Sequence, residues 1–163
     1  MKNLFLGFAL ICLSGAPMFS FGAPQSGKVT VAVGDVKTTP DAGVPLPVKA
    51  GQTVAVGSKI TTGPGARAVV VMTPRSAIRI SENSEVLIAE VDEAANPAKV
   101  LVDLKSGSLG ALLKPAADSP MDFRIKTPSG VAAARGTFYS VAVKDGKGFA
   151  QVKEGVIQII PNN

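Results

Sequence analysis

Apolar and polar residues alternate with a period of two along most of the chain from residue 28 onward. In 122–127 (DFRIKT), Phe123 and Ile125 alternate with basic residues, and in 99–104 (KVLVDL) apolar residues recur at every second position. Such alternation, rich in valine and isoleucine, is typical of half-buried β-strands. The pattern predicts strands at 28–33, 53–56, 66–72, 77–80, 85–91, 99–104, 108–113, 122–127, 136–143, 148–152 and 155–160.

Turn-forming residues separate these runs at short intervals, and no segment has a convincing helical period. The best helical candidate is 90–99 (EVDEAANPAK), but Pro97 truncates it because proline disrupts a helix interior. We therefore predict a single all-β domain over residues 28–160, a size that suits one domain.

A short sequence motif is repeated three times among the predicted strands, and we call this internal repeat the echo. Three segments share an apolar residue, a lysine, any residue and a glycine: VKAGQTV (48–54), LKSGSLG (104–110) and VKEGVIQ (152–158). Recurrence at such spacing suggests stacked supersecondary units, each burying its apolar face on the next. We predict a short β-solenoid-like stack of hairpins. A twisted β-sandwich is the alternative, because it gives similar strands without the echo.

The first 23 residues have the pattern of a secretory signal peptide. Lys2 provides the positive start, residues 4–13 are apolar, and small residues follow. The apolar core is shorter than the roughly 20 residues that span a bilayer. We expect cleavage after Gly22 or Ala23, and hence an exported protein that is periplasmic or secreted and has no stable membrane span.

The residue types of the mature chain exclude several kinds of chemistry. The sequence has no histidine or tryptophan, and its single cysteine, Cys12, lies in the predicted leader. Disulfides, Cys–His and Ser–His–Asp catalysis, and zinc or copper sites built on those ligands are therefore excluded. No Ser-x-x-Lys occurs after the leader either. We predict a protein that is not an enzyme and has no cofactor and no metal.

Charge adds little to this picture. Without Lys2 the chain has 16 basic and 12 acidic residues, and the basic ones are scattered. Aromatic residues are few, so we expect no nucleic-acid partner.

The acidic group Glu90, Asp92 and Glu93 has too few ligands for a calcium loop and reads as a solvated loop. Basic residues between positions 59 and 79 read as solubilising charges on edge strands: Lys59, Arg67, Arg75 and Arg79.

Turn and glycine motifs accompany the strands in a fixed order: Gly34-Asp35-Val36, Gly51, Thr62-Gly63, Gly107, Thr127-Pro128, Arg135-Gly136-Thr137 and Glu154-Gly155-Val156. This order resembles the FecR-domain family over most of residues 28–160, and the Thr-Pro…Arg-Gly-Thr segment is its most specific part. The sequence departs from the family at 73–76 (TPRS), where an Asp-Gly-Ser hairpin turn is usual.

The resemblance implies an extracytoplasmic signalling module. In bacterial iron uptake, FecR-like domains lie in the periplasm, joined by a membrane helix to a cytoplasmic sigma-factor regulator, and receive a signal from an outer-membrane transporter. For this chain we expect the extracytoplasmic module alone, in a stand-alone protein. Its partner would be an envelope protein, bound through loops or by strand addition at a sheet edge. An envelope glycan such as peptidoglycan is the alternative.

The residues of the most specific segment are interpreted as structural. Arg135 lies in an apolar run and could contact a partner, but we interpret it as a brace for the preceding turn, with Gly136 allowing close backbone approach. Alternation predicts that one of Phe138 and Tyr139 is buried and the other exposed. The predicted structural motif comprises Thr127, Pro128, Gly130, Arg135, Gly136, Thr137 and Gly155.

Overall fold

The computed structural model describes residues 26–114, 116, 121–134 and 138–162, and these residues form β-strands and loops without a helix. The predicted all-β class is confirmed. Within the same ranges, no helix has the length and apolar character that a membrane span requires.

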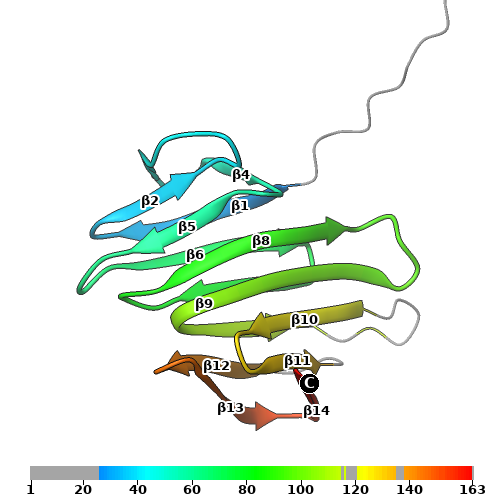
Figure 1. Ribbon diagram of the computed structural model, residues 1–163. Helices are drawn as coiled ribbons and strands as arrows, with labels where there is room; N and C mark the ends of the chain where they lie inside the picture. Colours follow the sequence, from blue (N-terminus) through cyan, green and yellow to red (C-terminus); the bar gives the residue numbers. More distant parts are fainter. Residues whose placement is uncertain (1–25, 115, 117–120, 135–137, 163) are drawn as a thin grey trace, which may run out of the picture.

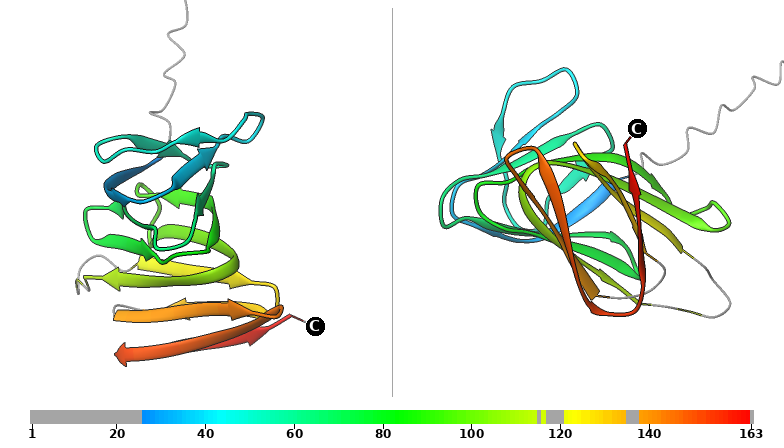
Figure 2. Two further views of the ribbon diagram at one scale, coloured as in Figure 1. Left: turned by 90° about the vertical axis from the view of Figure 1, so that its left-hand side faces the viewer. Right: turned by 60° about the horizontal axis from the view of Figure 1, so that its bottom comes forward.

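Fourteen strands form one hydrogen-bonded network that curls into two facing sheets (Figures 1 and 2). Sheet A contains, in spatial order, β4 (Thr53–Ala55), β1 (Ser26–Val33), β6 (Arg67–Thr73), β7 (Ser76–Ile80), the second half of β9 (Ala98–Leu113), β12 (Phe138–Lys144) and β13 (Lys147–Glu154). Sheet B contains β3 (Leu46–Pro47), β2 (Val36–Thr39), β5 (Lys59–Thr62), β8 (Glu85–Asp92), the first half of β9, β10 (Met121–Thr127), β11 (Gly130–Ala134) and β14 (Ile157–Pro161).

The chain passes back and forth between the sheets while it advances along one axis. The first strands lie at one end and the last strands at the other (Figure 1). Neighbouring strands pair antiparallel, apart from the parallel pair of β9 and β10. The predicted stack of hairpins is therefore present, and its two sheets also face each other across a common core, as they would in the alternative sandwich.

The core follows from the alternation in the sequence. Ala68, Val70 and Met72 of β6 are buried, as are Phe123 and Ile125 of β10, while the residues between them lie nearer solvent. These side chains belong to one cluster that fills the space between the sheets. Burial of such apolar area is the main contribution that holds a chain without disulfides in its fold.

Two features of the strands differ from the prediction. The segments 99–104 and 108–113 are not separate strands but parts of the single strand β9, which crosses from sheet B to sheet A. The sequence pattern also missed β2, β3, β5 and β11. Each of these strands has a single large apolar residue, namely Val36, Leu46, Ile60 or Val131, so alternation does not show in them.

The glycines of the internal echo share a backbone conformation. Gly51, Gly107 and Gly155 have φ values of 93°, 82° and 93°, in the left-handed region that favours glycine. Each lies where the chain passes from one sheet to the other: between β3 and β4, within β9, and between β13 and β14. The echo in the sequence therefore marks the crossing bends of the stack.

Candidate functional site

Two strand edges lie unpaired at the C-terminal end of the stack. Within the described residues, β13 pairs only with β12, and β14 pairs only with β11. Both strands form the last layer in Figures 1 and 2, one in each sheet. We call β13, β14 and their connection 155–156 the open end. Apart from the Gly148 N–H, which donates to the Ser129 hydroxyl, its outer backbone N–H and C=O groups can accept a further strand.

Side chains that point between the sheets remain exposed at the open end. Val152 lies opposite the buried Tyr139, and Ile159 lies opposite the buried Ala132, so both point toward the core. Nevertheless Val152 is 37% exposed and Ile159 is 60% exposed, because no further strand of the described residues covers them. The last layer of the core is therefore open to solvent.

The exposed apolar residues concentrate at this end. Six of the ten exposed large hydrophobic residues lie on the open end or on β12 beside it. Single exposed apolar residues are ordinary, but their accumulation at one end of the stack is typical of an interaction surface. The six residues are Phe138, Phe149, Val152, Val156, Ile159 and Ile160.

The opposite end of the stack is protected. Its edge strands β3 and β4 have only two and three residues, and β3 ends in Pro47, which cannot donate a backbone hydrogen bond. Val48 and Val54 are buried there, so the core is covered. Short edge strands and proline are common protections against strand addition. The two ends therefore differ: among the described residues, the unpaired edge strands are longer at the C-terminal end.

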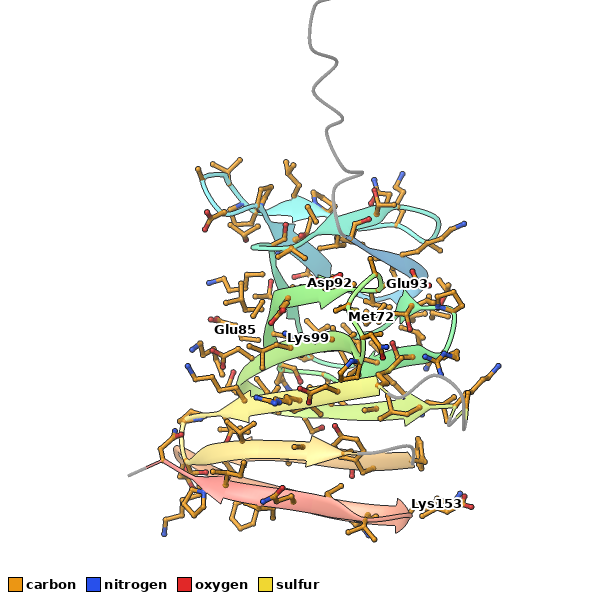
Figure 3. The ribbon with its side chains drawn as sticks, turned by 90° about the vertical axis from the view of Figure 1, so that its right-hand side faces the viewer. Met72, Glu85, Asp92, Glu93, Lys99 and Lys153 are labelled. Atoms are coloured by element: carbon orange, nitrogen blue, oxygen red, sulfur yellow. The ribbon has the colours of Figure 1, made fainter. Side chains whose placement is uncertain are left out.

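A charged side chain, Lys153, lies beside the exposed apolar residues. The Lys153 Nζ lies 5.5 Å from the centre of the Phe138 ring, a cation–π arrangement. Figure 3 shows Lys153 at this end of the molecule, far from Asp92 and Glu93. An apolar centre with a charged border is typical of surfaces that bind proteins.

The turn between β10 and β11 anchors the open end. The Thr127 hydroxyl donates to the Gly130 carbonyl at 2.9 Å, and the Ser129 hydroxyl accepts the Gly148 N–H at 2.7 Å. Asn162 donates its backbone N–H to the Ser129 carbonyl at 3.2 Å and its side-chain amide to the Pro128 carbonyl at 3.0 Å. The turn thus contacts the start of β13 and the residue after β14.

The structure brings together only part of the predicted motif. Thr127, Pro128 and Gly130 form the anchoring turn, and Gly155 lies at the opposite side of the open end, in the bend between β13 and β14. Arg135, Gly136 and Thr137 lie outside the described residues, so the interpretation of Arg135 as a brace stays a prediction.

A hollow beside this turn is too small for a metabolite. It measures about 30 Å³ and lies between the β10–β11 turn and β13. Small-molecule pockets are usually about 300–1,000 Å³. Thr127, Ser129, Gly148, Phe149 and Ile159 are among its lining residues. The open end therefore offers strand edges and apolar side chains rather than a deep pocket.

Other residues considered in the sequence have local partners. The Asp92 carboxylate accepts the N–H groups of Ala94 and Ala95 at 3.1 and 3.0 Å, so it closes its own loop. Lys59 forms an ion pair with Glu85, with 3.5 Å between Nζ and Oε1, on the outer side of sheet B.

Tyr139 is the largest fully buried side chain, and Phe138 beside it is exposed, as alternation predicted. The Tyr139 hydroxyl has no hydrogen-bond partner in the described part of the chain. Burial raises the pKa of this hydroxyl well above its ordinary value near 10. The group therefore stays neutral in the folded protein at alkaline pH, whereas it would ionise on unfolding.

Tyr139→Phe is expected to stabilise the protein by about 1 kcal/mol at neutral pH, because it removes a buried hydroxyl without a partner. Because burial raises the pKa of the Tyr139 hydroxyl, the stability of the wild-type protein is unaffected by this group's ionisation below pH 10 and declines as pH rises above 10. The advantage of the variant should therefore grow above pH 10. Urea unfolding at pH 7 and pH 11 measures both effects. Equal stability of the two proteins at both pH values would contradict the prediction.

The profile of the family described as FecR protein matches residues 58–158. The chain belongs to this family. The match runs from the residue before β5 into β14 and includes most of the open end. Searches of curated proteins and of solved structures returned no match. FecR domains are known from signalling in the cell envelope, and the family is regulatory rather than enzymatic.

The FecR domain keeps a hairpin turn where its sequence departs from the expected pattern. The segment 73–76 joins β6 to β7, and the buried Thr73 and Ser76 hydroxyls are 2.8 Å apart. The Arg75 N–H donates to the Thr73 hydroxyl at 3.3 Å. The turn therefore closes through side-chain hydroxyls, without the aspartate and glycine usual at this place.

Sequence reasoning missed the open end as a site. It predicted half-buried strands at 148–152 and 155–160 from their apolar residues, but burial depends on the layer that lies next to them. One signal was available: the third echo unit places Gly155 before an almost continuous apolar run, Val156 to Ile160, interrupted only by Gln158.

Proposed function

We propose that this FecR protein is an exported, non-enzymatic binding module that receives or relays a signal in the cell envelope by protein–protein interaction at its open end. The observation that carries this proposal is the difference between the two ends of the stack. One end has two unpaired strand edges and six exposed large hydrophobic residues nearby, whereas the other end has two such residues, Val44 and Leu46, and is bordered by short strands.

The chemistry of the chain supports binding rather than catalysis. Without histidine, and with its single cysteine in the predicted leader, the mature protein lacks the usual activated nucleophiles. The hollow at the open end is small, while its strand edges suit β-augmentation, in which backbone hydrogen bonds give affinity and alternate side chains give specificity. The apolar leader at residues 4–13 supports export.

Site-specific photo-crosslinking in intact cells tests the proposal. A photoreactive amino acid is placed at Phe149, which is 57% exposed at the open end, or at Val44, which is 70% exposed at the opposite end. We expect a discrete protein adduct from position 149 and none from position 44. The crosslinked chain should come from the periplasm or medium and lack 22 or 23 N-terminal residues by mass.

Three results would overturn the proposal: equal adducts from both positions, no adduct from position 149, or an uncleaved cytoplasmic protein. An adduct that disappears on digestion with a peptidoglycan hydrolase would instead favour the glycan alternative.

A further inference from the structure

We infer that the partner of the open end is a second copy of this chain, in a closed two-fold dimer joined through β13 and β14. The inference rests on the proposed function, because it takes the open end to be an interaction surface. It goes further by naming the occupant and the symmetry. Four features of the described residues carry it: two edges, their polarity, their inward side chains and the protected opposite end.

The open end presents two edges, one in each sheet, separated by the width of the core. A single added peptide strand would pair with one edge and leave the other unpaired. A second copy presents two edges with the same separation, because the separation is a property of the fold. It can therefore satisfy both edges at once.

A two-fold axis perpendicular to the sheets gives suitable strand polarity. Rotation about this axis reverses both the stacking direction and the strand direction, while each sheet keeps its side. β13 would then lie antiparallel to β13 of the second copy, and β14 antiparallel to β14 of that copy. Both contacts are antiparallel, the arrangement of most strand pairs in the stack, and the interface is self-complementary as two-fold dimers require.

The same arrangement closes the core. Val152 and Ala150 of β13 and Ile157 and Ile159 of β14 lie opposite buried residues, so they point between the sheets. In the dimer they would meet the same residues of the second copy and form one more apolar layer. This accounts for inward-facing residues that stay exposed in the single chain.

The opposite end prevents head-to-tail growth. An open end adding to β3 and β4 would meet strands of two and three residues and Pro47. Such edges accept strands poorly. Contact between two open ends uses up both surfaces, so the assembly stops at two copies instead of continuing as a fibre.

Two variants test the contributions of the strand edge and of the apolar layer separately. The turn at Asp145 and Gly146 makes Lys144 and Lys147 the hydrogen-bonded closing pair, so by ladder alternation the Ala150 N–H points to the outer edge. Ala150→Pro therefore blocks the edge without removing a bond to β12. Ile159→Lys places a charge in the apolar layer. Val44→Lys is the matched control at the opposite end.

Sedimentation velocity of the mature protein over a concentration series is the test. β13 and β14 have eight and five residues, fewer than the roughly 20–30 residues on each side of a standard interface. We therefore expect a reversible dimer with a Kd on the order of micromolar. Ala150→Pro and Ile159→Lys should each weaken it at least about tenfold, whereas Val44→Lys should leave it unchanged. Circular dichroism melts verify that each variant is folded.

A wild-type protein that stays monomeric throughout the series overturns the inference, and so does a dimer that both folded open-end variants retain. Failure here differs from failure of the proposed function. A monomer that still gives a foreign-protein adduct from position 149 retains the interaction surface but not the second copy. A crosslinked species of twice the chain mass supports both.

Discussion

Gly107→Ala is expected to lower the free energy of unfolding by about 2–5 kcal/mol. Gly107 has a φ of 82°, a conformation that costs residues with a Cβ about 1–2 kcal/mol. An added Cβ would also lie 2.5 Å from the Ser84 Cα and 2.6 Å from the Asn83 carbonyl oxygen, so backbone has to move. Overpacking of this kind costs typically about 1–3 kcal/mol more. Urea denaturation followed by circular dichroism measures the loss.

Gly51→Ala is the matched control. Gly51 has a similar φ of 93°, but an added Cβ would have no atom within 4 Å. It should therefore show the conformational cost alone, about 1–2 kcal/mol. The difference between the two variants isolates the contact between β9 and the segment before β8. Equal losses at the two positions would contradict this account of the crossing bend.

The sequence predicted those parts of the fold that depend on local pattern. Alternation located ten of the fourteen strands, because strands such as β6 and β10 bury every second residue. The echo pointed to stacked units, and its glycines turned out to be crossing bends. In each case one physical requirement restricts the residue types directly: a buried face requires apolar residues, and a left-handed backbone favours glycine.

The sequence could not predict what depends on long-range pairing. Nothing in 99–113 distinguishes two strands from one strand that bends at Gly107 and serves both sheets, because the bend is stabilised by Ser84, far away in sequence. The open end is a similar case. Ile159 and Ile125 are the same residue type in similar strands, but one is 60% exposed and the other is fully buried. Only the neighbouring layer distinguishes them.

The turn between β10 and β11 combines a local sequence signal with long-range contacts. Thr127 and Pro128 were singled out from the sequence as a turn, and their carbonyl oxygens accept the Asn162 side-chain amide at 3.4 and 3.0 Å, just after β14. Ser129, which lies in the same predicted turn but was not among the predicted motif residues, provides the hydroxyl that accepts the Gly148 N–H at the start of β13. The most specific segment of the family pattern therefore begins with the turn that contacts β13 and the residue after β14. This supports a role for that segment in presenting the open end.

Phe123→Ala is expected to destabilise the protein by about 3–5 kcal/mol. Phe123 is fully buried in β10, opposite Val100 of β9 and Ala134 of β11. The facing residues of β11 are small, namely Gly130, Ala132 and Ala134, so no neighbouring side chain there can move in to fill the space. The cost therefore includes the cavity as well as the lost transfer free energy. Thermal and urea unfolding measure it.

Phe149→Ala is the matched control, because it removes the same side chain at a position that is 57% exposed on the open end. Its effect on unfolding should stay within about 0.5 kcal/mol. Since β10 joins the last strands of sheet B to β9, the Phe123 variant should also speed amide hydrogen exchange in β11 and β14 more than in β6 and β7. Uniform acceleration would show that the stack unfolds as one unit. Preferential loss at the open end would show that its presentation depends on the layer beneath it.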